Sequence, residues 1–486
     1  MTRLDYTALR SLPADVMRPH RAAPPAIGIV HFGPGAFHRA HQASYIDTLL
    51  DHDPRWGIAA VALRSNAAVA GLAAQQGLYT IAVRDAVCVN RVVGAHGIWL
   101  GPNDSDRIAA LLADPAIAMV TMTVTEKGYC LAPDGTLDRN HPDIIHDLRG
   151  AGPPRSVIGW LVAGLATRRA QGNVPFVPMP CDNLAANGAK LHAALIAFAE
   201  ARDTHLAAWI AGEVRVPSTM VDSITPASDS GLVADVERSL GCADAIPVQR
   251  EAFLQWVIED IGPNAGPDLA SVGAVITSDP GGYERAKLRI LNGAHSALAY
   301  AGLLRGHASV AEAMADAELA NAVDAMVRTD IAPMLPPVSG LDLADYRRAV
   351  FTRFRNPVII HRLDQIAQDG TQKLPYRLGD TIDANRRVGR MPVLAIDAVG
   401  CWVAFLLQRL RAGVPVIDPV ASALADAASG ADVGRFVERL AAQGLGLARR
   451  WRDDPALMAA ITASATAAHD GAWQRLFRHN RGAVEH

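Results

Sequence analysis

The segment with the clearest chemical content is Lys287-Leu288-Arg289-Ile290-Leu291-Asn292-Gly293-Ala294-His295. On an ideal helix, Asn292 lies about 140° and His295 about 80° around the axis from Lys287, so the three share one face beside an apolar stripe. A lysine removed from water loses its proton more easily, which suits a general base acting on a secondary alcohol. A neighbouring amide can donate a hydrogen bond to an alkoxide or a ketone oxygen. The alternative is a lysine that reaches solvent and a histidine that belongs to the core.

Two further polar side chains, Asn183 and Asp222, stand where apolar residues would be expected. Asn183 follows an apolar run that ends at Pro180, and open α/β sheets place ligands at such strand ends. The preceding Asp182 favours a helix N-cap. Asp222 is a carboxylate between apolar neighbours in residues 219–226, which indicates either a structural turn or a ligand for a substrate hydroxyl. Neither segment is decisive by itself.

A glycine turn follows the first apolar run of the chain. Residues 26–32 stop at Gly33-Pro34-Gly35, and residues with helical spacing come next. Glycines let the backbone turn sharply and let a pyrophosphate approach the amides of the helix. The expected third glycine is His38, so the motif is either a degenerate dinucleotide fingerprint or an ordinary strand-to-helix turn. After the second expected strand, Arg64 replaces the acidic residue that holds the ribose of NAD, and an arginine could accept the 2′-phosphate of NADP.

The pattern of apolar residues predicts the scaffold. Strands are expected at 26–32, 57–63, 118–124, 174–179 and 213–216, with helices near 106–113 and over 184–210. This alternation predicts an α/β N-terminal Rossmann-type domain with a parallel sheet over residues 1–280. From about residue 281, strand-like runs nearly vanish, and a mostly α-helical C-terminal domain is expected over 281–486. Its amphipathic segments cover 283–304, 309–328, 342–353, 390–411, 417–428, 433–449 and 454–479.

Composition excludes several classes of protein. The 486 residues include 46 Lys plus Arg and 49 Asp plus Glu, and the net charge of −3 argues against a partner that is a nucleic acid or an anionic membrane. Five cysteines form no C-x-x-C pair, so neither a disulfide framework nor a cysteine-type zinc site is indicated. We expect no signal peptide and no membrane span, because the N-terminus lacks an apolar run and Asp397 interrupts the longest C-terminal one. A reducing cytoplasm is the expected location, with the oligomeric state left open and a monomer compatible.

With these motifs in order, the chain resembles the polyol-specific long-chain dehydrogenases, the mannitol dehydrogenase family, over essentially its whole length. The resemblance rests on the segments Ile29 to Gln42, Thr125-Glu126-Lys127-Gly128-Tyr129, Cys181-Asp182-Asn183 with Asn187-Gly188, Met220-Val221-Asp222 and Lys287-x4-Asn292-x2-His295. It implies a Rossmann-type domain followed by a helical domain, with the active site in the cleft between them.

The resemblance also implies roles for individual residues. Lys287 would be the acid/base, Asn292 and Asn183 would form the oxyanion hole, and no metal would be needed. His295 would orient the substrate and the lysine, and Asp222 would touch a substrate hydroxyl. The implied cofactor is NAD, with NADP not excluded, and its candidate binding residues are Gly33, Gly35, Phe37 and Arg64.

Residues 361–377 separate two branches of that family, the mannitol 2-dehydrogenases and the fructuronate reductases, also called mannonate oxidoreductases. The stretch Asp369-Gly370-Thr371-Gln372-Lys373-Leu374-Pro375-Tyr376-Arg377 resembles the second branch. Mannitol-type members tend to carry arginine where this chain has Gln365, and an acidic residue where it has Arg64. Lys373 and Arg377 could bind the carboxylate of a hexuronate, or they could be surface charges on a loop.

The expected function is metal-independent hydride transfer between a nicotinamide cofactor and C2 of a small linear sugar acid or polyol. D-fructuronate to D-mannonate is the first expectation, and D-mannitol to D-fructose, or oxidation of another polyol, is the second. A third possibility, from a different class, is a nucleotide-binding protein without catalysis. The joint presence of Lys287, Asn292, His295 and Asn183 argues against that class, because binding alone does not require them.

Overall fold

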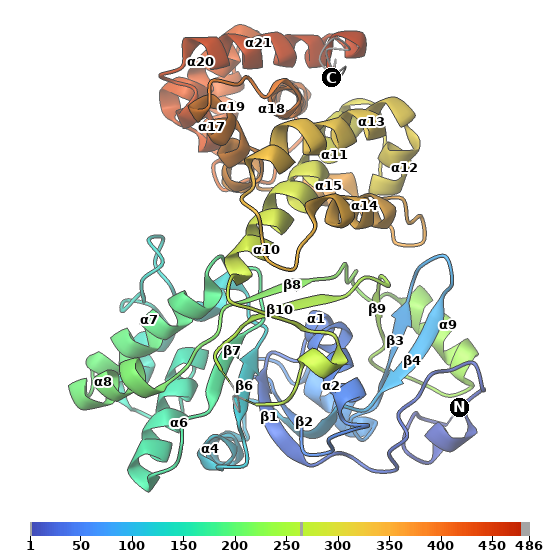
Figure 1. Ribbon diagram of the computed structural model, residues 1–486, viewed down its shortest axis with the longest axis vertical. Coiled ribbons are helices and arrows are strands. Elements are labelled where there is room, and N and C mark those ends of the chain that lie inside the picture. Colours follow the sequence, from blue (N-terminus) through green and yellow to red (C-terminus); the bar gives the residue numbers. More distant parts are fainter. Residues whose placement is uncertain (1, 263–265, 478–486) are drawn as a thin grey trace. The chain divides into compact units, whose positions relative to one another are not determined.

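The computed structural model describes residues 2–262 and 266–477 and divides into two compact units (Figure 1). Unit 1 is Met1–Gly281, and unit 2 is Gly282–His486. Each unit is described below by itself.

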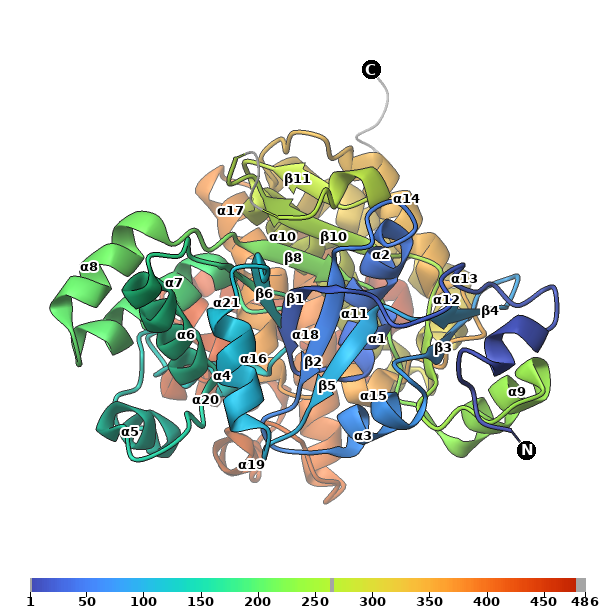
Figure 2. The same cartoon turned by 90° about the horizontal axis from the view of Figure 1, so that it is seen from below.

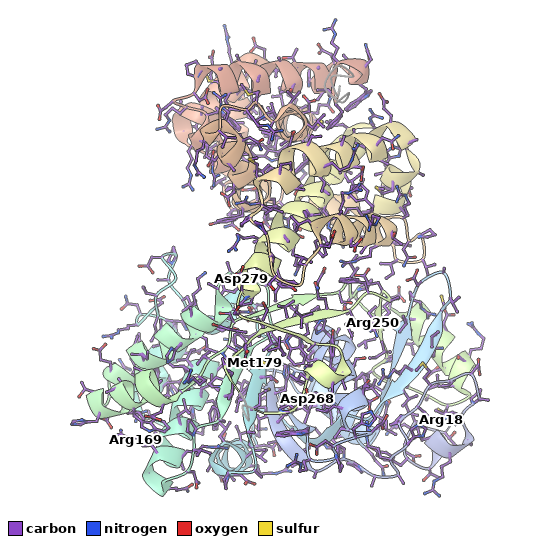
Figure 3. The ribbon with its side chains drawn as sticks, in the orientation of Figure 1. Arg18, Arg169, Met179, Arg250, Asp268 and Asp279 are labelled. Atoms are coloured by element: carbon purple, nitrogen blue, oxygen red, sulfur yellow. The ribbon has the colours of Figure 1, made fainter. Side chains whose placement is uncertain are left out.

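A five-stranded parallel sheet is the centre of unit 1, with strand order β5-β2-β1-β6-β7. Its strands are β1 (Ile27–Phe32), β2 (Gly57–Val61), β5 (His96–Leu100), β6 (Met119–Met122) and β7 (Val177–Pro180). Figure 2 shows β6, β1, β2 and β5 side by side, and Figure 3 labels Met179 on β7. All five residues of β2 are buried, as expected for a parallel strand covered on both faces.

Side chains of β1 alternate between two apolar clusters, one on each face of this sheet. Val30 and Phe32 pack with α4 (Ser105–Ala113), α6 (Val157–Gln171) and α7 (Asn187–Glu200). Ile29 packs on the other side with α1 (Ala36–Ala40) and α2 (Gln42–Leu49). The chain leaves β1 toward β2 on one side and returns to β6 on the other, so β1 and β6 flank the point where the strand order reverses. Ligands bind beyond the carboxyl ends of strands at such a point.

Two small sheets complete unit 1, in the orders β11-β10-β8 and β4-β3-β9. Their strands are β3 (Tyr79–Val83), β4 (Val89–Val93), β8 (Thr219–Asp222), β9 (Val248–Arg250), β10 (Gln255–Glu259) and β11 (Val275–Thr277). The remaining helices are α3 (Ala67–Ala74), α5 (Pro142–Arg149), α8 (Thr204–Glu213) and α9 (Ser230–Leu240), with 3₁₀ turns at Ala8–Ser11, Glu126–Tyr129 and Ala270–Val272.

The predicted Rossmann-type sheet and the helical second region are confirmed, but two local predictions are wrong. Residues 213–216 are not a strand: α8 ends at Glu213, and the strand β8 begins at Thr219. The helix predicted over 184–210 is two helices: α7 ends at Glu200, and Asp203 starts the second helix by accepting hydrogen bonds from the first turn of α8. Apolar periodicity cannot distinguish one long helix from two that belong to the same apolar core.

Unit 2 is helical and has one continuous apolar core. Helix α18 (Val393–Arg411) packs against α11 (Asn292–Leu304) and α21 (Pro455–His469). By length and hydropathy α18 could span a membrane, yet 78% of its apolar window is buried inside the protein, as in a core helix. The other helices are α10 (Pro280–Ala286), which begins at the end of unit 1, and α12 (Val310–Ala315), α13 (Ala317–Met326), α14 (Leu343–Phe354), α15 (Leu363–Ile366), α16 (Gly370–Leu374), α17 (Asp380–Arg387), α19 (Ala421–Ala428) and α20 (Val433–Gln443), with 3₁₀ turns at Ala332–Met334, Gly446–Arg450 and Trp473–Arg475.

Within residues 282–477, three π-helical turns interrupt the helices of unit 2. They are η4 (Lys287–Leu291), η5 (Val327–Ile331) and η7 (Pro375–Gly379). η4 lies in contact with both of the others. Single π-turns occur mostly inside α-helices and often at functional sites. Two of these turns include candidate site residues: η4 begins at Lys287, and η7 contains Arg377.

Candidate active site

Lys287 is the first residue of η4, and Asn292 is the first residue of α11. The backbone N–H of Asn292 donates to the carbonyl of Lys287, which closes a five-residue turn. The predicted angle of about 140° between these residues assumed an α-helix and is therefore wrong. The π-turn brings Asn292 to about one full turn above Lys287, so both side chains leave the helix on the same side. Both are partly exposed, which differs from the buried lysine expected from the sequence.

His295 lies one turn further along α11 and is buried. Its ring stacks on Phe354, with 4.2 Å between centroids, and meets the ring of His361 edge to face at 4.8 Å. Burial lowers the pKa of His295 well below its ordinary value, and the neighbouring His361, Arg377 and Arg353 act in the same direction. The Nε2 of His295 and the Nδ1 of His361 are both buried without a hydrogen-bond partner. Two neutral imidazoles therefore offer unused polar atoms at one place.

Arg377 lies in η7, and its Nη1 donates to the Ser296 hydroxyl at 3.1 Å. The backbone of η7 approaches α11 at Gly293, where a β-carbon would stand 3.0 Å from the carbonyl oxygen of Arg377. Burial lowers the pKa of Arg377, and Tyr300 partly opposes this shift. Among the described residues, no carboxylate forms an ion pair with Arg377. Glycine at 293 thus permits a close approach that holds a guanidinium beside His295.

Lys373, the other cation of the predicted pair, has protein partners. Its ammonium donates to the carbonyl of Gln368 at 2.9 Å and lies 3.5 Å from the carboxylate of Asp369. Burial and Arg377 lower the pKa of Lys373, whereas Asp369 raises it. A lysine that already has a carboxylate beside it is a weaker candidate for binding a substrate carboxylate than Arg377.

The glycine turn of unit 1 lies at the carboxyl end of β1, beside β6. Gly33 has a φ of 89°, and a β-carbon there would stand 2.5 Å from the carbonyl of Thr123, so only glycine fits. Gly35 is different: it is exposed, and a β-carbon would meet only the carbonyl of Gly33, at 4.0 Å. Phe37 follows in α1 and stacks on His41. The space above Gly35 is therefore available to a ligand.

His38, at the position of the missing third glycine, belongs to a buried histidine cluster that the sequence did not predict. Its ring stacks on His31 of β1 with 3.4 Å between centroids, and its Nε2 lies 3.0 Å from the Nε2 of His96 on β5. His31 also bonds Thr121 and the carbonyl of Gly33. Packing between rings replaces the close helix-to-strand contact that a glycine usually allows. The cluster also fixes the glycine turn through His31.

Burial determines the charge of this cluster. It lowers the pKa of His31 to about 3, with a smaller contribution from His96, and lowers the pKa of His96 to about 3, with a smaller contribution from Arg39. The pKa of His38 also falls well below its ordinary value. All three rings are neutral at physiological pH.

Arg64 follows β2 and is exposed, with its guanidinium 3.0 Å from a carboxylate oxygen of Asp143. In dinucleotide-binding folds, the residue at the end of this strand contacts the adenosine ribose. The position of Arg64 is compatible with that role, but its ion pair with Asp143 must break before Arg64 can bind a phosphate.

Asn183 is exposed in the loop after β7, and Asp222 is the buried last residue of β8. Asn187 connects the two segments, because its side chain exchanges hydrogen bonds with the backbone of Thr219 at 2.9 and 3.1 Å. The predicted N-cap role of Asp182 is wrong: α7 begins after Ala186, and Asp182 accepts hydrogen bonds from the Tyr129 hydroxyl and from the backbone of Leu184.

Together, the parallel sheet with its glycine turn and the polar helical segment define the class of the protein. The first is the architecture of a dinucleotide-binding domain. The second places a lysine, an amide and a guanidinium around one helix start, as an enzyme that moves a proton at a polar substrate requires. The class is a dehydrogenase that combines these two parts in one chain.

Comparison with known proteins identifies the family. Residues 27–270 match the mannitol dehydrogenase Rossmann domain, and residues 281–466 match the mannitol dehydrogenase C-terminal domain. The chain belongs to the mannitol dehydrogenase family, which confirms the resemblance drawn from the motifs and the predicted class of enzyme.

Individual relatives include both expected branches. A D-mannonate oxidoreductase of Escherichia coli is 40% identical over 403 residues, which cover 81% of this chain and 83% of the relative. A mannitol 2-dehydrogenase of Cereibacter sphaeroides is 36% identical, over 82% and 86% of the two chains. The solved Pseudomonas fluorescens mannitol 2-dehydrogenase, a ternary complex with NAD and D-mannitol, is 34% identical with a TM-score of 0.82, over 98% and 99% of the two chains.

Proposed function

We propose that this protein interconverts a ketone and a secondary alcohol at C2 of a linear sugar acid, with D-fructuronate and D-mannonate as substrate and product and NAD as the cofactor. The observation that supports this choice is Arg377, a desolvated guanidinium with no carboxylate beside it in the described part of the chain. The 40% identical D-mannonate oxidoreductase supports the same choice.

The argument for a substrate carboxylate is one of charge. Arginine stays protonated in proteins, so a partly buried guanidinium carries a desolvation cost that an anion can offset. Arg377 uses one nitrogen on the Ser296 hydroxyl, and its planar donor fork can still bind a carboxylate through two parallel bonds. The neutral rings of His295 and His361 lie beside it with unused nitrogens. An uncharged ketose would leave the guanidinium without a counter-charge.

The fit of the cofactor to unit 1 rests on the glycine turn. The open space above Gly35 lies past the end of β1, where a pyrophosphate can approach backbone amides without a side chain in the way. Gly33, with its positive φ, turns the chain there, and Phe37 and Arg64 flank the same end of the sheet. When bound, the nicotinamide accepts or donates the hydride. NAD is preferred over NADP because the Arg64 guanidinium already forms an ion pair with Asp143 and is therefore less able to bind a 2′-phosphate.

Proton transfer is proposed to belong to unit 2. Lys287 takes the hydroxyl proton in alcohol oxidation and returns it in ketone reduction. The Asn292 amide forms no hydrogen bond with the described protein residues, so it is free to donate to the oxygen on which charge develops. Asn183 is proposed as the second donor to that oxygen, and Asp222 as a partner of a substrate hydroxyl. His295 orients the substrate through its unused Nε2.

The test compares kcat/KM for D-fructuronate and D-fructose in the wild type and in Arg377→Ala. Loss of the charge pair should penalise the uronate selectively, by about 2 to 5 kcal/mol if the pair is desolvated. Arg362→Ala is the matched control, because Arg362 is exposed and pairs with Asp364 instead. Equal loss with both substrates, or a wild type that prefers D-fructose and D-mannitol, would replace the proposal with a mannitol 2-dehydrogenase.

A further inference from the structure

Outside the residues assigned to the reaction, three side chains with metal-binding atoms converge in unit 1. They are Cys130, His141 and Asp143, and the thiol sulfur, an imidazole nitrogen and a carboxylate oxygen all lie within 4.8 Å of one another. The sequence did not predict this cluster, because a search for C-x-x-C pairs does not detect ligands of three different types separated by a loop.

The loop that carries these residues is held by its own backbone. The carbonyl of Cys130 accepts from the Asp138 amide at 2.9 Å, and the carbonyl of Asp138 accepts from the His141 amide at 3.1 Å. A bridge between Leu131 and Leu137 closes the loop. Cys130 has a φ of 52°, an unusual conformation for a residue other than glycine. The three ligands are therefore brought together before any ion binds.

Each of the three side chains keeps unused binding capacity. The Cys130 thiol makes only a weak contact with the carbonyl of Gly128 at 3.9 Å. One carboxylate oxygen of Asp143 pairs with Arg64, and the other has no side-chain partner among the described residues. The Nδ1 of His141 accepts one bond from the Asp143 amide at 3.2 Å, and its Nε2 has no described partner. Because a neutral imidazole has a single acceptor nitrogen, an ion that binds His141 takes the place of this bond. Cys130 is buried, whereas the other two are partly exposed, so an ion can enter from solvent.

We propose that Cys130, His141 and Asp143 form a binding site for a thiophilic divalent ion, zinc being the best match. One sulfur, one nitrogen and one oxygen ligand suit a borderline-soft ion, and a water can complete a tetrahedron. Magnesium and calcium require all-oxygen ligands and are a poor match. The ion would bind at the rim of unit 1 and would take no part in hydride or proton transfer. It would instead compete with Arg64 for Asp143.

The first test is calorimetric titration of zinc chloride into the full chain after treatment with a chelator. One zinc per chain is expected. Cys130→Ser, His141→Asn and Asp143→Asn should each weaken binding by more than the ~10- to 100-fold that loss of a supporting hydrogen bond costs. Asparagine is itself a good N-cap, so His141→Asn preserves the start of α5. Cys88→Ser is the matched control, because Cys88 is exposed and lies outside the cluster.

Two further readouts exclude adventitious binding. Cobalt should give an intense sulfur-to-metal charge-transfer band with the wild type and with Cys88→Ser, and none with Cys130→Ser. Arg64→Ala should tighten zinc binding, because the substitution removes a cation that competes for Asp143. No stoichiometric binding, binding that survives Cys130→Ser, or an affinity indifferent to Arg64 would each overturn the proposal. Enzyme activity is not the readout, so a failure here would leave the proposed dehydrogenase reaction untouched.

Discussion

The neutral histidine cluster of unit 1 predicts a marked loss of stability in mild acid. His31 and His96 are fully buried, and burial lowers the pKa of each to about 3. In the unfolded chain, each ring regains a pKa of about 6.5. The folded state therefore binds fewer protons than the unfolded state when the pH lies between about 3 and about 6.5. The stabilisation is complete above that value and is lost as the pH falls toward about 3.

The size of the effect follows from the two pKa values. A pH of 5.0 lies about 1.5 units below the pKa of the unfolded ring. Protonation at that pH stabilises the unfolded state, and each unit of this difference is worth about 1.36 kcal/mol. Each ring thus costs about 2 kcal/mol, and the pair costs about 4 kcal/mol relative to pH 7.5. His38 adds a loss in the same direction. In unit 2, Asp397 opposes this trend, because burial raises its pKa to about 6 and its protonation favours the folded state.

A local measurement is needed because the two units respond differently. Urea denaturation at pH 7.5 and 5.0, read by hydrogen exchange of peptides from β1 and β5, reports on unit 1 alone. His96→Asn should reduce the pH-dependent loss by about 2 kcal/mol, whatever it does to stability at pH 7.5. His205→Gln, at an exposed position on α8, should leave the loss unchanged. If β1 and β5 lose less than about 1 kcal/mol between the two pH values, the rings are not held neutral and the reasoning fails.

Three other predictions concern the reaction and its cofactor. Lys287→Ala should lower turnover by the ~10² to 10⁴ typical of general acid/base catalysis and leave NAD binding intact. If steady-state kinetics show that the variant keeps more than about a tenth of wild-type turnover, the lysine is not the acid/base catalyst. Gly35→Val places a side chain in open space, so the fold should persist while calorimetry shows a steep loss of NAD affinity; unchanged affinity would put the phosphates elsewhere. Asp143→Asn releases Arg64 from its ion pair, so the affinity for NADP should rise relative to NAD, whereas Arg64→Ala should abolish that gain.

The sequence predicted the parts of the fold that depend on regular patterns. Uniformly apolar strands such as Gly57–Val61 and the glycine turn at Gly33 indicated the parallel sheet directly. Short strands such as Val248–Arg250 were missed, because three residues carry no detectable period and form only through pairing with distant strands. The number of residues in the helical turn at Lys287 was also missed, since a π-turn depends on tertiary contacts and not on local preference.

In the candidate site too, residues with a local pattern could be predicted, and residues that depend on tertiary contacts could not. Lys287 and Asn292 could be named from their types and spacing, but His361 could not, because nothing local links it to His295 more than sixty residues earlier in the chain. The signal for His31 and His96 was present only in part: a histidine replaces the third glycine of the turn, and such a ring needs partners inside the sheet. The sequence could not show that Lys373 pairs with Asp369, whereas Arg377 bonds the Ser296 hydroxyl and forms no ion pair with a described carboxylate.

The π-turn at Lys287–Leu291 holds one residue more than an ordinary helical turn. Removing one of the four intervening residues would let ordinary α-helical hydrogen bonds continue from α10 into α11. Residues four apart on an α-helix are about 400° apart, or about 40° past one full turn, so the asparagine would stay on the side of Lys287. The core face of α11, where Ala294, Ala297 and Leu298 are fully buried, would keep nearly its present orientation. The helix therefore absorbs a length change of one residue within this single turn, and a related chain with one residue fewer here would still place its lysine beside its asparagine.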